Sequence, residues 1–348
     1  MFQKKTRISL LVLGLIFMGL KTYAQKPDWV KVEKSSHENS IKISIAGKVF
    51  TQFLYPDSLE KPVLFPIYNS SGNLVTRGFP LIKQEGDPTD HPHHIGLWFT
   101  FENINGLDFW NNSYAIPPDK KNHYGWIRTD TILKMQSGRK GILEYHALWT
   151  NQNHEALLEE TTRFIFSGMG NERKIDRITE LKAVQNVLFK DAKDGLLGLR
   201  MAHALQIPSL EDQKYTDSKG NETLIKGGMD TIARGNYLTS EGKTGNDAWS
   251  TRARWCKAFG KIGRDSTCIV IMDHPKNLNY PTFWHARGYG LFAANPLGEK
   301  IFTQGKSEKN YSLKKGESMT FRFRVIIQNG KHTLNPKEID LLAKEEIP

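Results

Sequence analysis

The stretch IKISIAGKVFTQFLY, residues 41–55, carries the clearest structural signal in the sequence. Isoleucine occupies every second position of its first half and alternates with polar residues, which is the period of a β-strand with one buried face. Gly47 and Lys48 interrupt that pattern, and a second strand-like segment follows at residues 49–55. The stretch therefore predicts an antiparallel β-hairpin.

Strand-length apolar segments separated by turn residues recur along the rest of the chain. They lie at residues 62–68, 74–79, 142–149, 159–166, 173–181, 196–207 and 320–327. Only the C-terminus predicts a helix, with Asn335 as its cap, Pro336 at its first position and Glu338 three residues after the cap. Many short strands with few helices indicate an all-β fold, a large antiparallel β-sandwich or barrel with a short C-terminal helix.

The N-terminus is typical of a secretory signal peptide. Lys4, Lys5 and Arg7 precede an apolar run at residues 8–20, and small residues lead to Ala24. A run of this length is short for a membrane span. We expect cleavage after Ala24 and a periplasmic or secreted protein that has no membrane segment after cleavage. Residues 25–348 are predicted to form a single β-sandwich domain, in which the polar, Gly-rich residues 209–229 form an exposed loop.

The formal net charge of +11 is spread among acidic residues and contains no long basic run. Together with export, this argues against a nucleic-acid partner and leaves an acidic sugar or a merely solvated surface. The sequence has only two cysteines, Cys256 and Cys268, which is too few for a disulfide scaffold. Whether they pair, and whether the protein forms oligomers, is left open by the sequence.

The first concentration of chemically active residues is DHPHHIGLWF at residues 90–99, followed by NGLDFW at residues 105–110. Pro92 excludes a helix interior, so we expect an extended segment with His91 and His93 on the same side. Histidine titrates near neutral pH and suits general acid–base chemistry. Aromatic rings suit the apolar faces of a sugar, and polar side chains suit its hydroxyl groups. The candidates here are His91, His93, His94, Trp98, Asn105, Asp108 and Trp110.

A metal site is the main alternative for this segment, because His-x-His on a strand is a familiar ligand spacing. It lacks a decisively placed third ligand, so we predict neither a metal nor another cofactor. A serine hydrolase is not indicated, because the sequence contains no Gly-x-Ser-x-Gly motif.

The second concentration comprises DHP at residues 273–275 and PTFWHARGYG at residues 281–290. It adds a carboxylate, an indole, an imidazole and a guanidinium to the candidates, namely Asp273, Trp284, His285 and Arg287. His123 and Arg252, each near a tryptophan, are lesser candidates. We predict that His91–His94, His123 and His285 line one cavity that accommodates a small molecule.

These motifs, together with RARWC at residues 252–256 and LFAANPLG at residues 291–298, resemble the bacterial PmoA family of Bacteroidetes and Planctomycetes, over roughly residues 42–330. Members of that family usually have Arg where this sequence has Ile95. The family takes its name from a membrane-bound methane oxygenase subunit, whose several spanning helices have no counterpart in this sequence. The resemblance implies a galactose mutarotase-like supersandwich fold and a role in sugar degradation.

We therefore expect an exported enzyme that acts on a sugar or glycoside by hydrolysis, elimination or epimerisation. Mutarotases, which the implied fold resembles, pair a histidine acid with a carboxylate base. By that likeness His93 or His94 is the expected acid, Asp273 or Glu160 the expected base, and Arg252 and Arg287 bind substrate oxygens. The alternative is a non-catalytic glycan-binding protein whose Trp98, Trp110 and Trp284 form a stacking platform.

Overall fold

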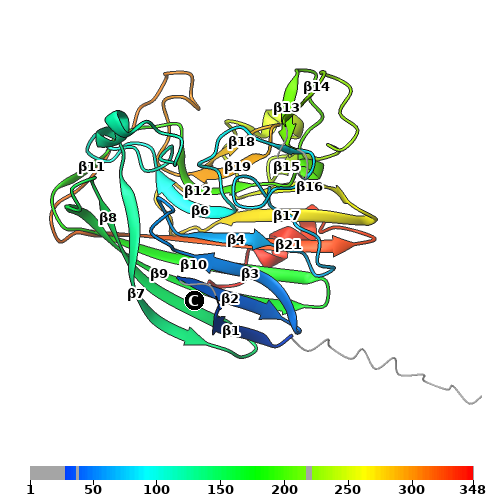
Figure 1. Cartoon of the computed structure of the whole chain (residues 1–348), viewed down its shortest axis with the longest axis horizontal. Coiled ribbons are helices and arrows are strands. Elements are labelled where there is room, and N and C mark those ends of the chain that lie inside the picture. The colour runs from blue at the N-terminus through cyan, green and yellow to red at the C-terminus, as the bar shows by residue number, and fades with distance from the viewer. Residues whose placement is uncertain (1–27, 37–38, 217–221, 348) are drawn as a thin grey trace, which may run out of the picture.

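Two eight-stranded antiparallel sheets dominate the computed structural model, which describes residues 28–36, 39–216 and 222–347 (Figure 1). The predicted signal peptide lies outside the described residues. In spatial order, the strands of the first sheet are β1 (Val30–Lys34), β2 (Ser40–Ile45), β3 (Lys48–Leu54), β4 (Val63–Ile67), β6 (Leu97–Phe101), β12 (Gly195–Arg200), β19 (Leu291–Asn295) and β18 (Phe283–Ala286). The hairpin predicted from residues 41–55 is the pair β2–β3.

The second sheet is built mostly from longer strands and lies behind the first sheet in the view of Figure 1. Its spatial order is β15 (Asn236–Thr239), β16 (Trp255–Ile262), β17 (Asp265–Asp273), β21 (Ser318–Gly330), β10 (Glu172–Ala183), β9 (Ala156–Met169), β8 (Gly141–Thr150) and β7 (Trp126–Gln136). The predicted all-β class, with its large antiparallel sandwich, is therefore confirmed.

The remaining elements are short and lie around the ends of the sheets. They are the ribbons β13 (Gln213–Thr216), β14 (Glu222–Ile225) and β5 (Asp87–Pro88), the pair β11 (Val187–Phe189) and β20 (Tyr311–Leu313), the 3-10 helices η1 (Pro118–His123), η2 (His203–Leu205) and η3 (Gly245–Ala248), and the helix α1 (Pro336–Leu342). None of the described helices is long and apolar enough to cross a membrane.

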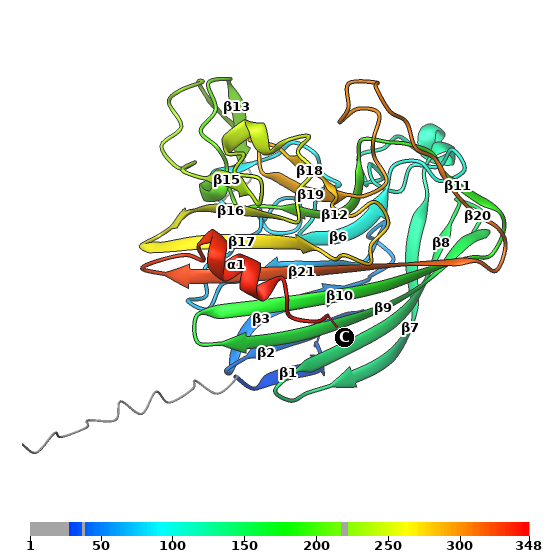
Figure 2. The same ribbon diagram turned by 180° about the vertical axis from the view of Figure 1, so that it is seen from behind.

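Side chains point alternately to the two faces of each strand. Apolar side chains on one face form the core between the sheets, and others form a second apolar layer on the outer face of each sheet. In β21, Phe321, Phe323 and Val325 face the core. Arg324 on the opposite face is buried as well, because α1 covers it and Leu342 accepts a hydrogen bond from its guanidinium (Figure 2). The predicted cap of α1 is present, since the Asn335 side chain accepts hydrogen bonds from two backbone amides of the first turn.

Three segments differ from the sequence expectation. Residues 74–79 pair through isolated bridges rather than as a strand. The segment 196–207 is a strand only as far as Arg200 and then turns into η2. The polar segment 209–229 contains β13 and β14, a ribbon that pairs with β5 and projects from the body of the molecule (Figure 1). Backbone pairing with β5 explains why this segment forms a ribbon despite its polar composition.

The two cysteines are unpaired. Cys256 lies opposite Ile271 in the β16–β17 pair, whereas Cys268 lies opposite Phe259, three residues further along. Cys256 packs into the core between the sheets, and Cys268 packs under α1. The thiols therefore point to opposite faces of the sheet and cannot form a disulfide in this fold.

Candidate functional site

The histidine-rich segment between β5 and β6 is a tight turn, so the predicted extended conformation is wrong. The amide of His94 donates to the carbonyl of His91 at 3.0 Å, and His91 has a positive φ of 46°. Pro92 follows His91 because the fixed φ of proline suits the second position of such a turn. The turn folds the imidazoles of His91 and His94 together instead of placing His91 and His93 side by side.

The turn builds a column of four rings on the outer face of the first sheet. Trp98 stacks on His94 at 5.1 Å, His94 on His91 at 4.8 Å, and His91 on Tyr289 at 5.1 Å between ring centroids. Gly198, opposite Trp98 on β12, makes room for the indole, because a Cβ there would lie 2.5 Å from its ring. The column runs from a fully buried tryptophan to a half-exposed imidazole.

Asp90 joins this column to two buried arginines. Its Oδ1 accepts from Arg200 at 2.6 Å and from Arg77 at 2.9 Å, and its Oδ2 lies 2.5 Å from Nδ1 of His91. Burial acts to raise the pKa of Asp90, but the hydrogen bond from His91 and the two guanidinium charges outweigh burial and bring it below the usual range. Asp90 is therefore a carboxylate that holds His91 in one orientation.

Beneath the turn lies a buried polar cluster whose hydrogen bonds are incomplete. Nε2 of His93 and the indole nitrogens of Trp98 and Trp110 have no partner within the described part of the chain. Lys61 donates to the carbonyl of Trp110 at 2.8 Å, and burial lowers its pKa to about 8. Burial, together with the Lys61 charge, lowers the pKa of His93 to about 2, and burial also lowers that of His94. Both imidazoles are neutral at physiological pH.

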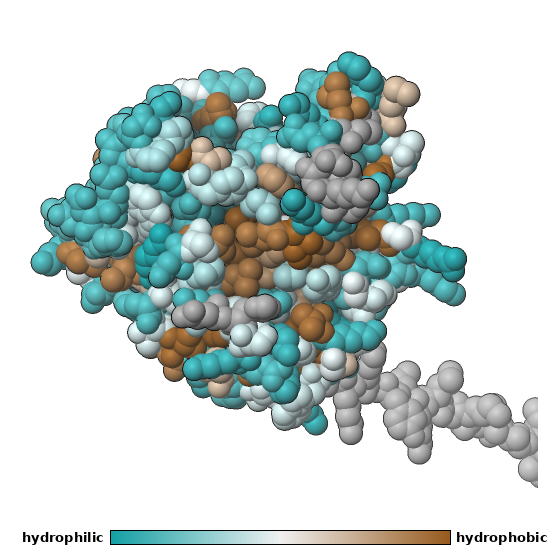
Figure 3. Space-filling view, viewed as in Figure 1, coloured by the Kyte–Doolittle hydropathy of each residue, from teal (hydrophilic) through white to brown (hydrophobic). Residues whose placement is uncertain are grey.

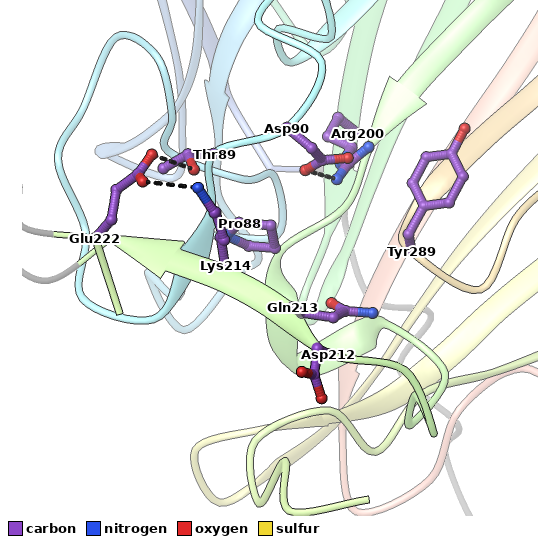
Figure 4. A pocket seen from close by; sticks show the side chains of 9 residues that line it. All are labelled: Pro88, Thr89, Asp90, Arg200, Asp212, Gln213, Lys214, Glu222 and Tyr289. Carbon is purple, nitrogen blue, oxygen red and sulfur yellow. Dashed lines mark hydrogen bonds and ion pairs between the residues drawn. The ribbon is translucent and has the colours of Figure 1, made fainter. Parts of the chain in front are cut away.

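A hollow of about 420 Å³ opens beside Asp90, Arg200 and Tyr289, and the β13–β14 ribbon closes its other side (Figure 4). Figure 4 shows Arg200 between Asp90 and the Tyr289 ring, with Lys214 and Glu222 of the ribbon across from them. The guanidinium of Arg200 lies 4.8 Å from the centre of that ring. The hollow therefore combines an aromatic wall with charged groups that already neutralise one another.

Polar residues dominate the surface around the ribbon, whereas an apolar band crosses the middle of the same face near β4 (Figure 3).

His285 lies on the same sheet face but at a distance from the ring column. Cross-strand pairing aligns Trp98, Gly198, Ala293 and His285 in one row over four strands. Three strand spacings separate the ends of that row by about 14 Å. His285 is buried and pairs with Asp194 at 3.3 Å, and burial is the main cause of its lowered pKa. The hollow beside Asp90 is lined by none of the histidines predicted to share one cavity.

The other predicted residues are distributed over the fold. Asp273 is buried at the end of β17, where it accepts from Asn277 and Thr282, and burial raises its pKa to about 7. Arg252 donates to the carbonyls of Asn279 and Pro281. Asn105 and Asp108 hold loop backbone through hydrogen bonds to their side chains, and His123 is exposed on η1.

Burial corrects two of the predicted roles. Glu160 is fully buried between the sheets and accepts hydrogen bonds from four side chains, so it has no access to a substrate. Trp98, Trp110 and Trp284 are each 0% exposed and therefore offer no face to a glycan. Tyr289, rather than a tryptophan, is the aromatic ring that lines the hollow.

Sequence reasoning missed Lys61, Arg77, Arg200 and Tyr289. Arg200 carried a usable signal, because it ends the apolar segment GLLGLR of β12, where a charge is costly unless it is paired. Lys61 and Arg77 lie in loops without any local pattern. Their proximity to the histidines arises only from the pairing of β4 with β6 and of Arg77 with Arg200.

No group of three or more His, Cys, Asp or Glu residues within the described ranges is arranged to hold a metal ion.

Residues 40–344 match the model of a family of unknown function, DUF6807, and the chain belongs to that family. No curated protein matches the sequence. Among solved structures, the chain is similar to the GH36 α-galactosidase AgaB from Geobacillus stearothermophilus, with 10% identity, a TM-score of 0.39, and coverage of 88% of this chain and 42% of that one. The chain thus spans less than half the length of that enzyme.

Two further similar structures are the heparan sulfate lyase HepC from Pedobacter heparinus and Slr1438 from Synechocystis sp. PCC 6803. HepC shows 10% identity and a TM-score of 0.29, covering 89% of this chain and 36% of that one. Slr1438 shows 11% identity and a TM-score of 0.30, covering 89% and 99%.

Proposed function

We propose that this member of the family is an exported enzyme that acts on a sugar or glycoside bound in the hollow beside Asp90, Arg200 and Tyr289. The observation that carries the proposal is the placement of Asp90, whose carboxylate contacts His91 at 2.5 Å, on the wall of a hollow of about 420 Å³ that also has one aromatic wall. Sites for small ligands fall in this range of volume. Mutually paired charges supply donors and acceptors for hydroxyl groups without imposing a net charge.

His91 is the residue best placed for proton transfer. Its Nδ1 is held by Asp90, and its Nε2 makes no hydrogen bond within the described residues. A carboxylate that orients an imidazole in this way fixes one tautomer and stabilises the imidazolium that forms during proton transfer. His93 and His94 are 9% and 2% exposed, and we assign them to supporting the turn rather than to contact with the substrate.

The chemistry open to such a site is hydrolysis, elimination or epimerisation, each of which moves a proton to or from a sugar oxygen or carbon. The motif resemblance to the PmoA family and its association with sugar degradation support this class. The N-terminal pattern of the sequence supports a periplasmic or secreted location. A glycan-binding protein without catalysis remains the second reading, with Tyr289 in place of the tryptophan platform.

The test is a screen of glycan fragments and keto-sugars for turnover by the wild-type chain, followed by kinetics of His91→Gln. Loss of a positioned acid or base lowers kcat by about 10²–10⁴-fold, and we expect a KM within about threefold of the wild type, since glutamine retains hydrogen bonding. His332→Gln, an exposed histidine in the loop after β21, is the matched control and should leave kcat unchanged.

An active wild type with unchanged kcat in His91→Gln would remove His91 from the mechanism. Binding without turnover for every compound, weakened by Tyr289→Ala, would support the glycan-binding protein instead. Calorimetry on the same variants separates the two outcomes.

A further inference from the structure

Strand β14 is the outer edge of the ribbon that projects from the body of the molecule (Figure 1). The strand order of this small sheet is β14–β13–β5, so β13 pairs with one side of β14. Among the described residues, no strand pairs with its other side. An exposed edge presents backbone N–H and C=O groups that can pair with a strand from another chain.

The side chains along this edge form a self-complementary pattern. Glu222, Leu224 and Lys226 occupy alternate positions and therefore share one face. Lys226 follows the last residue of β14, and its ion pair with Asp212 at 2.6 Å keeps it opposite β13 in the same register. If two copies of this strand pair antiparallel about Leu224, each Glu222 lies opposite Lys226 of the other copy, and the two leucines meet at the centre.

The charges of this pattern are available for new partners. Within one chain, Glu222 pairs with Lys214 at 3.3 Å, and both side chains are more than half exposed, as is that of Lys226. Exposed pairs of this kind contribute little and exchange partners readily. Lysine on an edge usually discourages pairing with other strands. In the register about Leu224, however, each lysine meets a glutamate, so the pattern favours pairing with a second copy.

Exposed apolar side chains lie on and beside the same edge. Leu224 is 52% exposed, and Leu210 and Met229 are 90% and 70% exposed. The Met229 amide donates to the carbonyl of Lys226 at 3.0 Å, and a Cβ at Gly228 would lie 4.0 Å from the Leu210 side chain. Both residues therefore lie at the Lys226 end of the strand. Pairing at the edge would give these side chains apolar surface to contact.

We propose that β14 pairs antiparallel with β14 of a second copy of this chain, so that the two ribbons join into one continuous sheet. The contact is isologous, because each copy supplies the same patch. Backbone hydrogen bonds supply affinity, as in other cases where a strand is added to a sheet edge, and the pairs between Glu222 and Lys226 set the register. A contact of this size gives a weak and reversible dimer.

The experiment is sedimentation equilibrium of the purified protein from about 5 µM to about 500 µM. We expect the mass to rise from that of one chain towards that of two. Leu224→Asp places two carboxylates side by side at the two-fold axis and should weaken association at least about tenfold. Leu188→Asp changes an exposed leucine of β11, away from the ribbon, and should associate as the wild type does.

Exchange of charges tests the register. Glu222→Lys leaves only lysine at the two charged edge positions, and Lys226→Glu leaves only glutamate. Each variant alone should therefore associate at least about tenfold more weakly than the wild type. In an equal mixture the two variants should form a heterodimer about as tight as the wild-type dimer, because every lysine then lies opposite a glutamate. Restored association would also show that the ribbon is folded in both variants.

A wild type that stays monomeric at every concentration would overturn the dimer and leave the edge to a strand of another protein. A dimer that Leu224→Asp does not weaken would place the contact on another surface. A dimeric wild type whose charge variants fail to associate when mixed would overturn the antiparallel register. None of these outcomes bears on the proposed carbohydrate function, which is tested by turnover.

Discussion

Two buried polar regions of this protein differ in how completely their hydrogen bonds are formed. Between the sheets, Glu160 accepts from Arg177 at 2.7 Å, Tyr145 at 2.6 Å, Thr162 at 2.7 Å and Trp149 at 2.8 Å. Under the histidine-rich turn, by contrast, His93, Trp98 and Trp110 each keep a buried nitrogen with no partner in the described structure.

A buried polar group with complete hydrogen bonds stabilises the fold, whereas a buried polar group without a partner destabilises it. A buried ion pair whose two carboxylate oxygens both accept hydrogen bonds is stable as a unit and specifies how the sheets pack. A buried donor without a partner lowers stability by about 1–3 kcal/mol. Such groups persist where the surrounding structure holds them for another purpose, and here they lie directly beneath the proposed site.

Breaking the complete network should produce the largest change in stability. Arg177→Met leaves the Glu160 carboxylate buried without its counter-charge, and we expect the free energy of unfolding in urea to fall by about 3–5 kcal/mol. Lys182→Met on the same strand breaks an exposed pair with Glu159 and should cost less than about 1 kcal/mol. A loss in Arg177→Met no larger than in Lys182→Met would mean that the interior network contributes nothing as a unit.

The buried cluster with incomplete hydrogen bonds should make the stability of the protein depend on pH. The folded chain holds His93 neutral, with a pKa of about 2, whereas an unfolded chain protonates it below its ordinary value of about 6.5. The folded state is therefore destabilised as the pH falls below about 6.5. For this one group, the free energy of unfolding decreases by about 1.4 kcal/mol per pH unit. His93→Gln should reduce the slope between pH 6 and pH 4 by that amount.

Urea unfolding at several pH values measures this slope, and His332→Gln supplies an exposed histidine as the reference. A slope that His93→Gln leaves unchanged would show that His93 takes up its proton in the folded state.

The smallest expected effect concerns the exposed end of the ring column. Tyr289→Leu removes the stacking on His91 and the contact with the Arg200 guanidinium, and we expect a loss of about 1 kcal/mol in the free energy of unfolding. Its larger effect should be on ligand affinity, because the same ring lines the hollow beside Asp90. A variant that unfolds with a loss above about 3 kcal/mol would place Tyr289 in the fold rather than in the site.

Local patterns were sufficient for much of the architecture. The alternating isoleucines of residues 41–45 produce β2 because a period of two puts apolar side chains on one face, whatever the rest of the chain does. The cap of α1 is equally local, since Asn335 and Glu338 exchange hydrogen bonds with the backbone of one turn. The same holds for the choice of the histidine-rich segment as the candidate site, because its density of imidazoles is visible without any fold.

Only the tertiary structure decided what these residues do. The sequence does not distinguish a tryptophan or glutamate at the surface from one in the core. The burial of Trp98 and Glu160 follows from which strands pack against them. The site also joins residues from separate parts of the chain, since Arg77, Asp90, Arg200 and Tyr289 meet where β12 ends beside the turns that flank it. Residue types and spacing therefore determined the fold class and the choice of the segment that carries the candidate site. The partners, exposure and protonation of its residues depend on contacts between distant segments, which no local pattern encodes.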